Sequence, residues 1–197
     1  MLKLRQAEES EVVLAFLQAE VDSPRWAKYY SGALAEYGAN RSELIDHADL
    51  KDKAANGVRR ALLGRFRGFG VNRCLFAGFP DDVQWRWVRL CAAELTILKY
   101  ANCAPWTELS DGTRLVTDGA KNLAAMDAET RRNIESIAQG VRQDRPFPPL
   151  IAVESNSGFL LLVEGHCRAT AYVAAGLCGS IDLLVGSSPG ISAWQFF

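Results

Sequence analysis

Cysteine and histidine are scarce in this chain of 197 residues, and they are not spaced as metal ligands. There are five cysteines, no two of which form a Cys-X-X-Cys pair, and two histidines. An odd number of scattered cysteines argues against both a disulfide framework and a zinc ribbon. The two histidines add too few ligands for a zinc site. We therefore expect a protein of the reducing cytoplasm.

Long hydrophobic runs and charge of one sign are also lacking. No run approaches the roughly 18 apolar residues of a membrane span, and the first eight residues contain no apolar core of a secretory signal. The 22 Lys and Arg residues nearly balance the 23 Asp and Glu residues, for a net charge of -1. The sequence thus predicts no membrane association, and nucleic-acid binding would need a local basic patch.

One basic patch is present, between Arg59 and Arg67. Arginines interleaved with aromatic residues can follow a nucleic-acid backbone and stack on its bases. The stretch is short, however, and no overall excess of positive charge reinforces it. We favour a solvated junction between a helix and a loop, and we do not expect nucleic acid as a partner.

The first 103 residues show helical periodicity. Expected helices cover residues 8–20, 23–38 and 50–63. The clearest one covers residues 79–100, because Pro80 and the two acidic residues after it suit a helix start. The apolar stripe that follows indicates a buried central helix.

From residue 104 onward, short apolar runs alternate with turns. The pattern predicts a helix over 128–139 that Asp127 caps, a β-hairpin of strands 150–153 and 159–163, a helix over 166–175 and a strand over 181–185. The predicted fold class is therefore α+β. A helical N-terminal region, residues 1–103, is followed by a small mixed α/β domain, residues 104–197.

One junction in the second part carries chemistry: Glu164-Gly165-His166-Cys167-Arg168 connects a buried strand directly to a helix. The first N–H groups of a helix have no intrahelical partner, and together with the helix dipole they form an anion site. Gly165 allows a tight turn and close approach of a phosphate, and Arg168 adds a bidentate cation. The predicted phosphate or nucleotide site consists of Gly165, His166, Cys167, Arg168 and the hydroxyl of Thr170.

Glu164 and His166 are the candidate catalytic residues of this site. A carboxylate beside a phosphate could hold Mg²⁺ against the phosphates or act as general base toward a substrate hydroxyl. A histidine at the positive end of a helix has a lowered pKa, so its neutral imidazole could relay a proton. The alternative is structural: Glu164 and Arg168 form an i, i+4 surface pair, and His166 only caps the helix.

The order of motifs around this junction resembles that of the ParB/sulfiredoxin superfamily. The motifs are Glu135-Ser136-Ile137, Gly140, the proline-led strand from Pro148 to Val153, and Gly165-His166-Cys167-Arg168-Ala169, in that order. The resemblance covers residues 127–185 and implies that residues 104–197 fold as a ParB/sulfiredoxin-like domain. Such domains often direct an arginine toward the ligand in the region of Arg114, and the alternative for this residue is a surface arginine of a turn.

The motif differs from two branches of the superfamily. Partition ParB proteins have Gly-Glu-Arg-Arg at this turn and bind CTP with it, whereas sulfiredoxins have Gly-Cys-His-Arg with a catalytic cysteine. Here His166 and Cys167 follow the glycine, so neither CTP nor sulfiredoxin activity is implied, although the helix start and Arg168 would both lower the pKa of the Cys167 thiol. The motif is most similar to the Asp-Gly-His-His-Arg of ParB-fold free-serine kinases, which implies phosphoryl transfer from a nucleotide.

Two functions follow from this resemblance. In the first, the chain is a nucleotide-dependent phosphotransferase or nucleotide hydrolase that uses a nucleoside triphosphate or diphosphate with Mg²⁺ and, for transfer, a small-molecule acceptor. In the second, it is a non-catalytic module that senses a nucleotide or interacts with another protein. The aromatic segment from Trp194 to Phe197 suits either a homodimer contact or docking onto the core.

Overall fold

One mixed sheet of six strands runs through the computed structural model, which describes the whole chain, residues 1–197. The strand order is β1-β2-β6-β4-β5-β3. The strands are β1 (Leu2–Ala7), β2 (Gln84–Cys91), β3 (Leu98–Lys99), β4 (Leu150–Glu154), β5 (Leu160–Glu164) and β6 (Ser180–Ser187). The α-helices are α1 (Glu9–Glu20), α2 (Ala27–Glu36), α3 (Lys53–Arg67), α4 (Ala104–Leu109), α5 (Val116–Gly119), α6 (Ala128–Arg142) and α7 (His166–Ala175).

Helices α1, α2, α3 and α6 confirm four of the predicted helices. The predicted cap of α6 is present, since the Asp127 carboxylate accepts hydrogen bonds from the N–H groups of Glu129 and Thr130 at 3.1 and 2.9 Å. Strands β4 and β5 form the predicted antiparallel hairpin, and β6 pairs parallel with β4. The mixed sheet with helices on both faces agrees with the predicted α+β class.

The predicted central helix over residues 79–100 is wrong. This segment forms strand β2, a 3-10 helix over Ala92–Ile97, and strand β3. In β2 the buried Trp85 lies in the core with α1 to α3, whereas Val88 and Leu90 lie on the opposite face of the strand, in the core with α7. β2 pairs with β6 along its whole length and with β1 on its other side, and strand β1 was not predicted.

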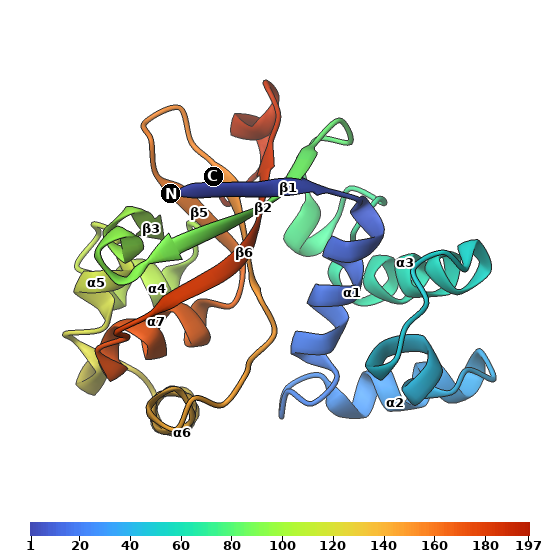
Figure 1. Cartoon of the computed structure of the whole chain (residues 1–197), viewed down its shortest axis with the longest axis horizontal. Coiled ribbons are helices and arrows are strands. Elements are labelled where there is room, and N and C mark those ends of the chain that lie inside the picture. The colour runs from blue at the N-terminus through green and yellow to red at the C-terminus, as the bar shows by residue number, and fades with distance from the viewer.

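The sheet has an apolar core on each face. One core combines α1, α2 and α3 with sheet residues such as Ile151, Val163 and Leu184. The other core combines α7 with strand residues that point to the opposite face of the sheet, such as Leu162 and Leu183. Figure 1 shows α1 to α3 on one side of the sheet and α4 to α7 on the other. Strands from both sides of the predicted boundary at residues 103 and 104 therefore share one sheet and one core.

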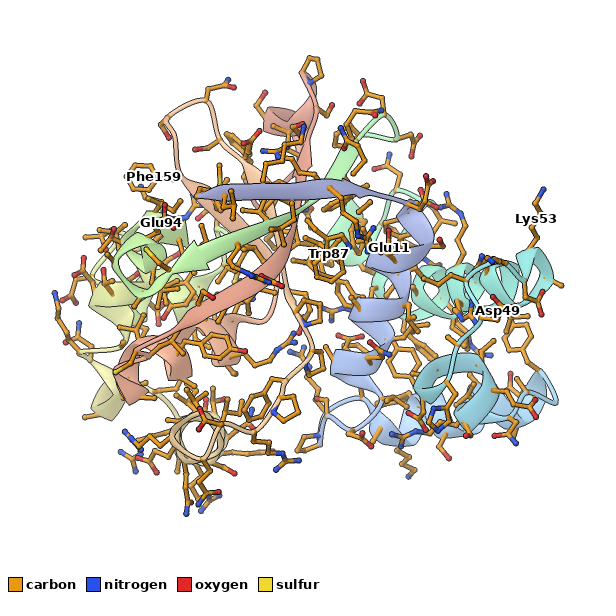
Figure 2. All side chains as sticks on the ribbon, in the orientation of Figure 1. Glu11, Asp49, Lys53, Trp87, Glu94 and Phe159 are labelled. Carbon is orange, nitrogen blue, oxygen red and sulfur yellow. The ribbon has the colours of Figure 1, made fainter.

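A single carboxylate connects the edge of the sheet to the N-terminal helices. Glu11 of α1 accepts hydrogen bonds from the Trp87 indole of β2 at 2.9 Å and from the Arg5 guanidinium of β1 at 2.9 Å (Figure 2). It also accepts the backbone N–H of Glu8 and so completes a capping box at the start of α1. These contacts fix the direction in which α1 leaves β1.

The aromatic C-terminal segment docks onto the core. Trp194 is buried, and its indole N–H donates to the Leu75 carbonyl at 2.6 Å. Of the two predicted roles for this segment, the structure shows docking onto the core, and the homodimer stays a prediction. None of the helices combines the length and the apolar character that crossing a membrane requires.

Candidate functional site

The predicted strand–turn–helix junction is present where β5 leads into α7. Gly165 makes the turn with φ +97, in the left-handed region that favours glycine. A Cβ atom at this position would lie 2.5 Å from the Leu150 side chain. The turn therefore needs glycine for its backbone angle and for its close packing.

The first turn of α7 leaves backbone donors unused. The first backbone hydrogen bond of the helix runs from the Ala169 N–H to the Gly165 carbonyl at 2.8 Å. The N–H groups of His166, Cys167 and Arg168 make no hydrogen bond to the rest of the chain. Unpaired N–H groups at a helix N-terminus attract an anion.

The residues that carry these donors line a pocket of about 650 Å³, to which the whole predicted segment from Glu164 to Arg168 contributes. The opposite wall comes from the end of α1, the connection to α2 and the end of α3. Four arginines and three carboxylates line the pocket: Arg25, Arg67, Arg145, Arg168, Glu20, Asp22 and Glu164. The pocket thus unites the predicted motif with residues from the N-terminal helices.

Arg168 is buried and occupied by contacts within the chain. Its guanidinium donates to the carbonyls of Pro148 and Pro149, the second at 3.2 Å, and to the Glu164 carboxylate at 3.1 Å. Only 7% of the Arg168 side chain and 19% of the Glu164 side chain are exposed. The structure therefore shows the i, i+4 pair between these residues, in a buried rather than a surface setting.

His166 is packed into an aromatic stack in the pocket wall. Its ring lies 6.0 Å from that of Tyr100 and 5.3 Å from that of Trp106. Burial, together with the charges of Arg67 and Arg168, lowers the pKa of His166 to about 3, so the imidazole is neutral, as predicted. Nε2 accepts the Ala101 N–H at 3.3 Å, which assigns the proton of the neutral ring to Nδ1, a donor without a partner in the chain.

Cys167 is not an activated thiol. Burial, together with the nearby Glu164 carboxylate, raises its pKa to about 11. This is contrary to the lowering expected from a helix N-terminus beside an arginine, because removal of the thiol from water outweighs both effects. The Cys167 side chain therefore stays protonated at neutral pH.

Thr170 and Arg114 do not line the pocket. The Thr170 hydroxyl is fully buried, donates to the His166 carbonyl at 2.8 Å and bonds the Tyr100 hydroxyl at 2.7 Å. Arg114 donates to the carbonyls of Tyr100 and Phe197 at 3.0 and 3.1 Å. The structure thus places both residues behind the pocket, where they support its aromatic wall and the C-terminal segment.

Several pocket residues were not predicted from the sequence, among them Glu20 and Arg67. Glu20 follows Phe16 by one helical turn, so a carboxylate on the apolar face of α1 was the signal that could have found it. Burial raises its pKa to about 7, a shift that the Arg67 charge only partly offsets. Arg67 had been considered only as the end of the basic stretch.

The basic stretch itself is tied into the fold. Arg59 is buried and donates to the Leu44 carbonyl at 2.6 Å. The other arginines pair with acids: Arg60 with Glu9, Arg65 with Glu36 and Arg67 with Glu20. These contacts are consistent with the predicted junction between a helix and a loop, and the absence of a nucleic-acid partner stays a prediction.

No three His, Cys, Asp or Glu side chains are close enough together to hold a metal ion on their own. Mg²⁺ that Glu164 binds together with ligand phosphates stays a prediction. No family model, no curated protein and no solved structure matches the chain. The resemblance to the ParB/sulfiredoxin superfamily therefore stays a prediction that depends on the order of motifs.

Proposed function

We propose that the protein binds a phosphate-bearing small molecule, a nucleotide, in the pocket at the N-terminus of α7. The observation that carries this proposal is the meeting of three unpaired backbone N–H groups and four arginines in one pocket of about 650 Å³. A pocket of this volume is within the range of small-molecule sites. The N–H groups and the positive end of the helix dipole would receive a phosphate.

The charge balance of the pocket favours an anion. Four arginines outnumber the three carboxylates. One of these carboxylates, Glu20, is only partly ionised at neutral pH because burial raises its pKa to about 7. The Glu164 carboxylate is neutralised by Arg168. The field inside the pocket is therefore positive, which attracts phosphates.

The aromatic wall suits the base of a nucleotide. Trp26, Trp106, Phe147 and Phe196 all line the pocket. Bases stack on aromatic rings irrespective of their identity, and such stacking contributes about 1–3 kcal/mol per base. A nucleoside triphosphate or diphosphate with Mg²⁺, the ligand that the resemblance to ParB-fold proteins implies, would combine both parts of the pocket.

Binding without turnover is the function that the geometry supports best. The groups predicted to be catalytic are restrained: Glu164 pairs with Arg168, and the pKa of His166 is too low for proton exchange at neutral pH. A nucleotide-dependent phosphotransferase or hydrolase is the second candidate, which Glu20 favours. Its pKa of about 7 suits a general base, a role that sequence analysis had given to Glu164.

A thermal-shift screen tests the proposal directly. ATP, ADP, CTP and GTP with Mg²⁺, and inorganic phosphate alone, are added to the wild type and to Arg145→Glu. Arg145 is exposed at the rim of the pocket, so its charge can be reversed without disturbing the core. A nucleotide at about 100 times its Kd should stabilise the fold by about 2.7 kcal/mol.

The matched control is Arg132→Glu, which reverses an exposed arginine on α6 outside the pocket lining. We expect Arg145→Glu to weaken nucleotide binding about tenfold, a loss of about 1.4 kcal/mol, and Arg132→Glu to leave it unchanged. An absence of stabilisation by every nucleotide would contradict the proposal. Release of phosphate or its transfer to an acceptor, lost in Glu20→Gln, would establish the enzymatic candidate.

A further inference from the structure

We propose that Arg67 is the side chain that binds the anion, and that its ion-pair partner Glu20 takes up a proton when the anion enters. This inference rests on the proposed function, since it requires an anionic ligand in the pocket. It replaces Arg168, the cation chosen from sequence, with an arginine from the opposite wall. It also makes ligand binding depend on pH.

Arg67 presents a guanidinium whose hydrogen-bonding capacity is unused. It is the last residue of α3, and 17% of its side chain is exposed. Its guanidinium lies 4.9 Å from the ring centre of Trp26 and 5.7 Å from that of Phe16. Its Nε is buried without a hydrogen-bond partner, and Glu20 Oε1 of the ion pair is 3.2 Å away.

Arg168 also pairs with a glutamate, but its guanidinium makes more contacts within the chain than that of Arg67 does. Its guanidinium donates three hydrogen bonds within the chain, two to the carbonyls of Pro148 and Pro149 and one to Glu164. Two of its five N–H groups remain, but a phosphate that took the place of the carbonyl contacts would leave buried groups unsatisfied. At Arg67 a phosphate would replace a single contact, the ion pair with Glu20, and the contact with Trp26 holds the planar group in place.

The protonation of Glu20 depends on the groups around it. Only 5% of its side chain is exposed. Four groups act on it from the surrounding elements: the Tyr30 hydroxyl of α2, which donates to it at 2.7 Å, Arg67 of α3, Glu164 of β5, and Arg25 between α1 and α2. Glu20 is therefore a buried carboxyl that Arg67 and Tyr30 help to keep ionised and that Glu164 and burial help to keep protonated.

Anion binding favours the protonated form of Glu20. A phosphate that pairs with Arg67 takes away the main counter-charge of Glu20 and adds negative charge beside it. The Glu20 carboxylate then forms an O–H bond with a proton taken from solution, and no bond between heavier atoms is made or broken. The neutral carboxyl can donate its new O–H to a ligand oxygen. Proton uptake and anion binding are thereby linked.

Isothermal titration calorimetry measures both parts of this inference. The nucleotide found by the thermal-shift screen is titrated into the wild type at pH 7.5 in two buffers of different ionisation enthalpy. The difference in heat gives the number of protons taken up for each ligand bound. We expect uptake of between about half a proton and one proton in the wild type, beyond the value for Glu20→Gln. Subtraction of the Glu20→Gln value removes protons that the ligand itself exchanges.

The affinity measurement uses Arg67→Met, which keeps apolar packing against Trp26 and Phe16. The matched control is Arg60→Met on the same helix, because Arg60 pairs with Glu9 and does not line this pocket. We expect binding to weaken at least tenfold in Arg67→Met and to stay unchanged in Arg60→Met. Arg67→Lys, which keeps the charge without the planar fork, should be intermediate and serves if Arg67→Met fails to fold.

Three outcomes would contradict the inference in distinguishable ways. Unchanged affinity in both Arg67 variants would remove Arg67 from the site and leave the proposed pocket standing. Equal proton uptake in the wild type and Glu20→Gln would remove the linkage to Glu20. An absence of binding by every nucleotide to the wild type would refute the proposed function and the inference with it.

Discussion

At the scale of single residues, Glu20 makes the stability of the fold depend on pH. Burial raises its pKa to about 7 from an ordinary value of 4.5. The Glu20 carboxyl thus holds its proton more tightly in the folded state than in the unfolded state. Its contribution to the free energy of unfolding is complete below pH 4.5 and is lost as the pH rises to about 7. Between pH 5 and pH 8, we expect the free energy of unfolding of the wild type to fall by on the order of 2 kcal/mol relative to that of Glu20→Gln.

Urea unfolding of both proteins at pH 5 and pH 8 measures this difference. Glutamine keeps the shape of the side chain and its capacity to accept the Tyr30 hydroxyl, so only the titration is removed. Parallel pH dependences of the two proteins would show that Glu20 does not titrate in this range.

Arg168 is predicted to contribute more to stability than to ligand binding. Arg168→Met removes the hydrogen bonds to the carbonyls of Pro148 and Pro149 and leaves Glu164 unpaired in a largely buried site. We expect a loss of about 3 kcal/mol in the free energy of unfolding. The control is Arg89→Met, because Arg89 pairs with Asp182 on the exposed surface and should contribute far less. Similar losses in the two variants, by chemical denaturation, would contradict a structural role for Arg168.

The sequence was informative about residues whose role is local. Gly165 was predicted because a strand followed at once by a helix requires a tight turn, and Asp127 because a helix start requires a cap. The partners of Arg168 could not be predicted, since the two carbonyls come from a loop about 20 residues away in sequence. Glu20 and Arg67 are 47 positions apart, so only the tertiary fold shows that they pair.

At the scale of elements, the error over residues 79–100 shows where local pattern is ambiguous. The stretch Trp85-Arg86-Trp87-Val88-Arg89-Leu90 has apolar residues both at alternate positions and three residues apart, so it fits a strand or a helix. Its aromatic and β-branched residues favour a strand. The neighbours β1 and β6, from opposite ends of the chain, decide the outcome by hydrogen bonding to both of its edges.

The ionised Glu11 carboxylate should stabilise the junction of β1, α1 and β2, and protonation at low pH should remove this stabilisation. Its hydrogen bonds with Arg5, and further ones from the Glu8 N–H and the Trp87 indole, lower its pKa to about 2. The contribution to stability is therefore present above pH 4.5 and is lost as the pH falls toward 2. We expect Glu11→Gln to lower the free energy of unfolding by about 1 kcal/mol at pH 7, since solvent screens part of the interaction. Near pH 2 the variant and the wild type should be equally stable. A difference that persists unchanged at pH 2 would exclude this ionisation as the cause.

At the scale of the whole molecule, the N-terminal helices and the strands after residue 104 form one core. Buried residues of α1 and α3, such as Phe16 and Leu62, belong to the same cluster as Ile151 and Leu184. The pocket lies between these two parts, so its acidic and basic groups are brought together only when both are folded. This arrangement explains why the sequence revealed one wall of the site and missed the other.

The shared core predicts how fragments behave. Residues 104–197 expressed alone would expose the sheet face that α1 to α3 cover, and β6 would lack its partner β2. We expect this fragment to show no cooperative thermal transition, whereas the full chain unfolds in a single one. Circular dichroism on both proteins provides the comparison. A cooperative transition in the fragment would show that residues 104–197 are an independent domain.

A crystal structure of the complex with the nucleotide would show whether a phosphate binds between the start of α7 and Arg67. We expect phosphate oxygens at about 2.7–3.2 Å from the backbone nitrogens of Cys167 and Arg168 and from the Arg67 guanidinium. We also expect the hydrogen bonds of the Arg168 side chain to the carbonyls of Pro148 and Pro149 to be retained. A phosphate bound elsewhere, or a pocket that stays empty at saturating nucleotide, would contradict the proposed site.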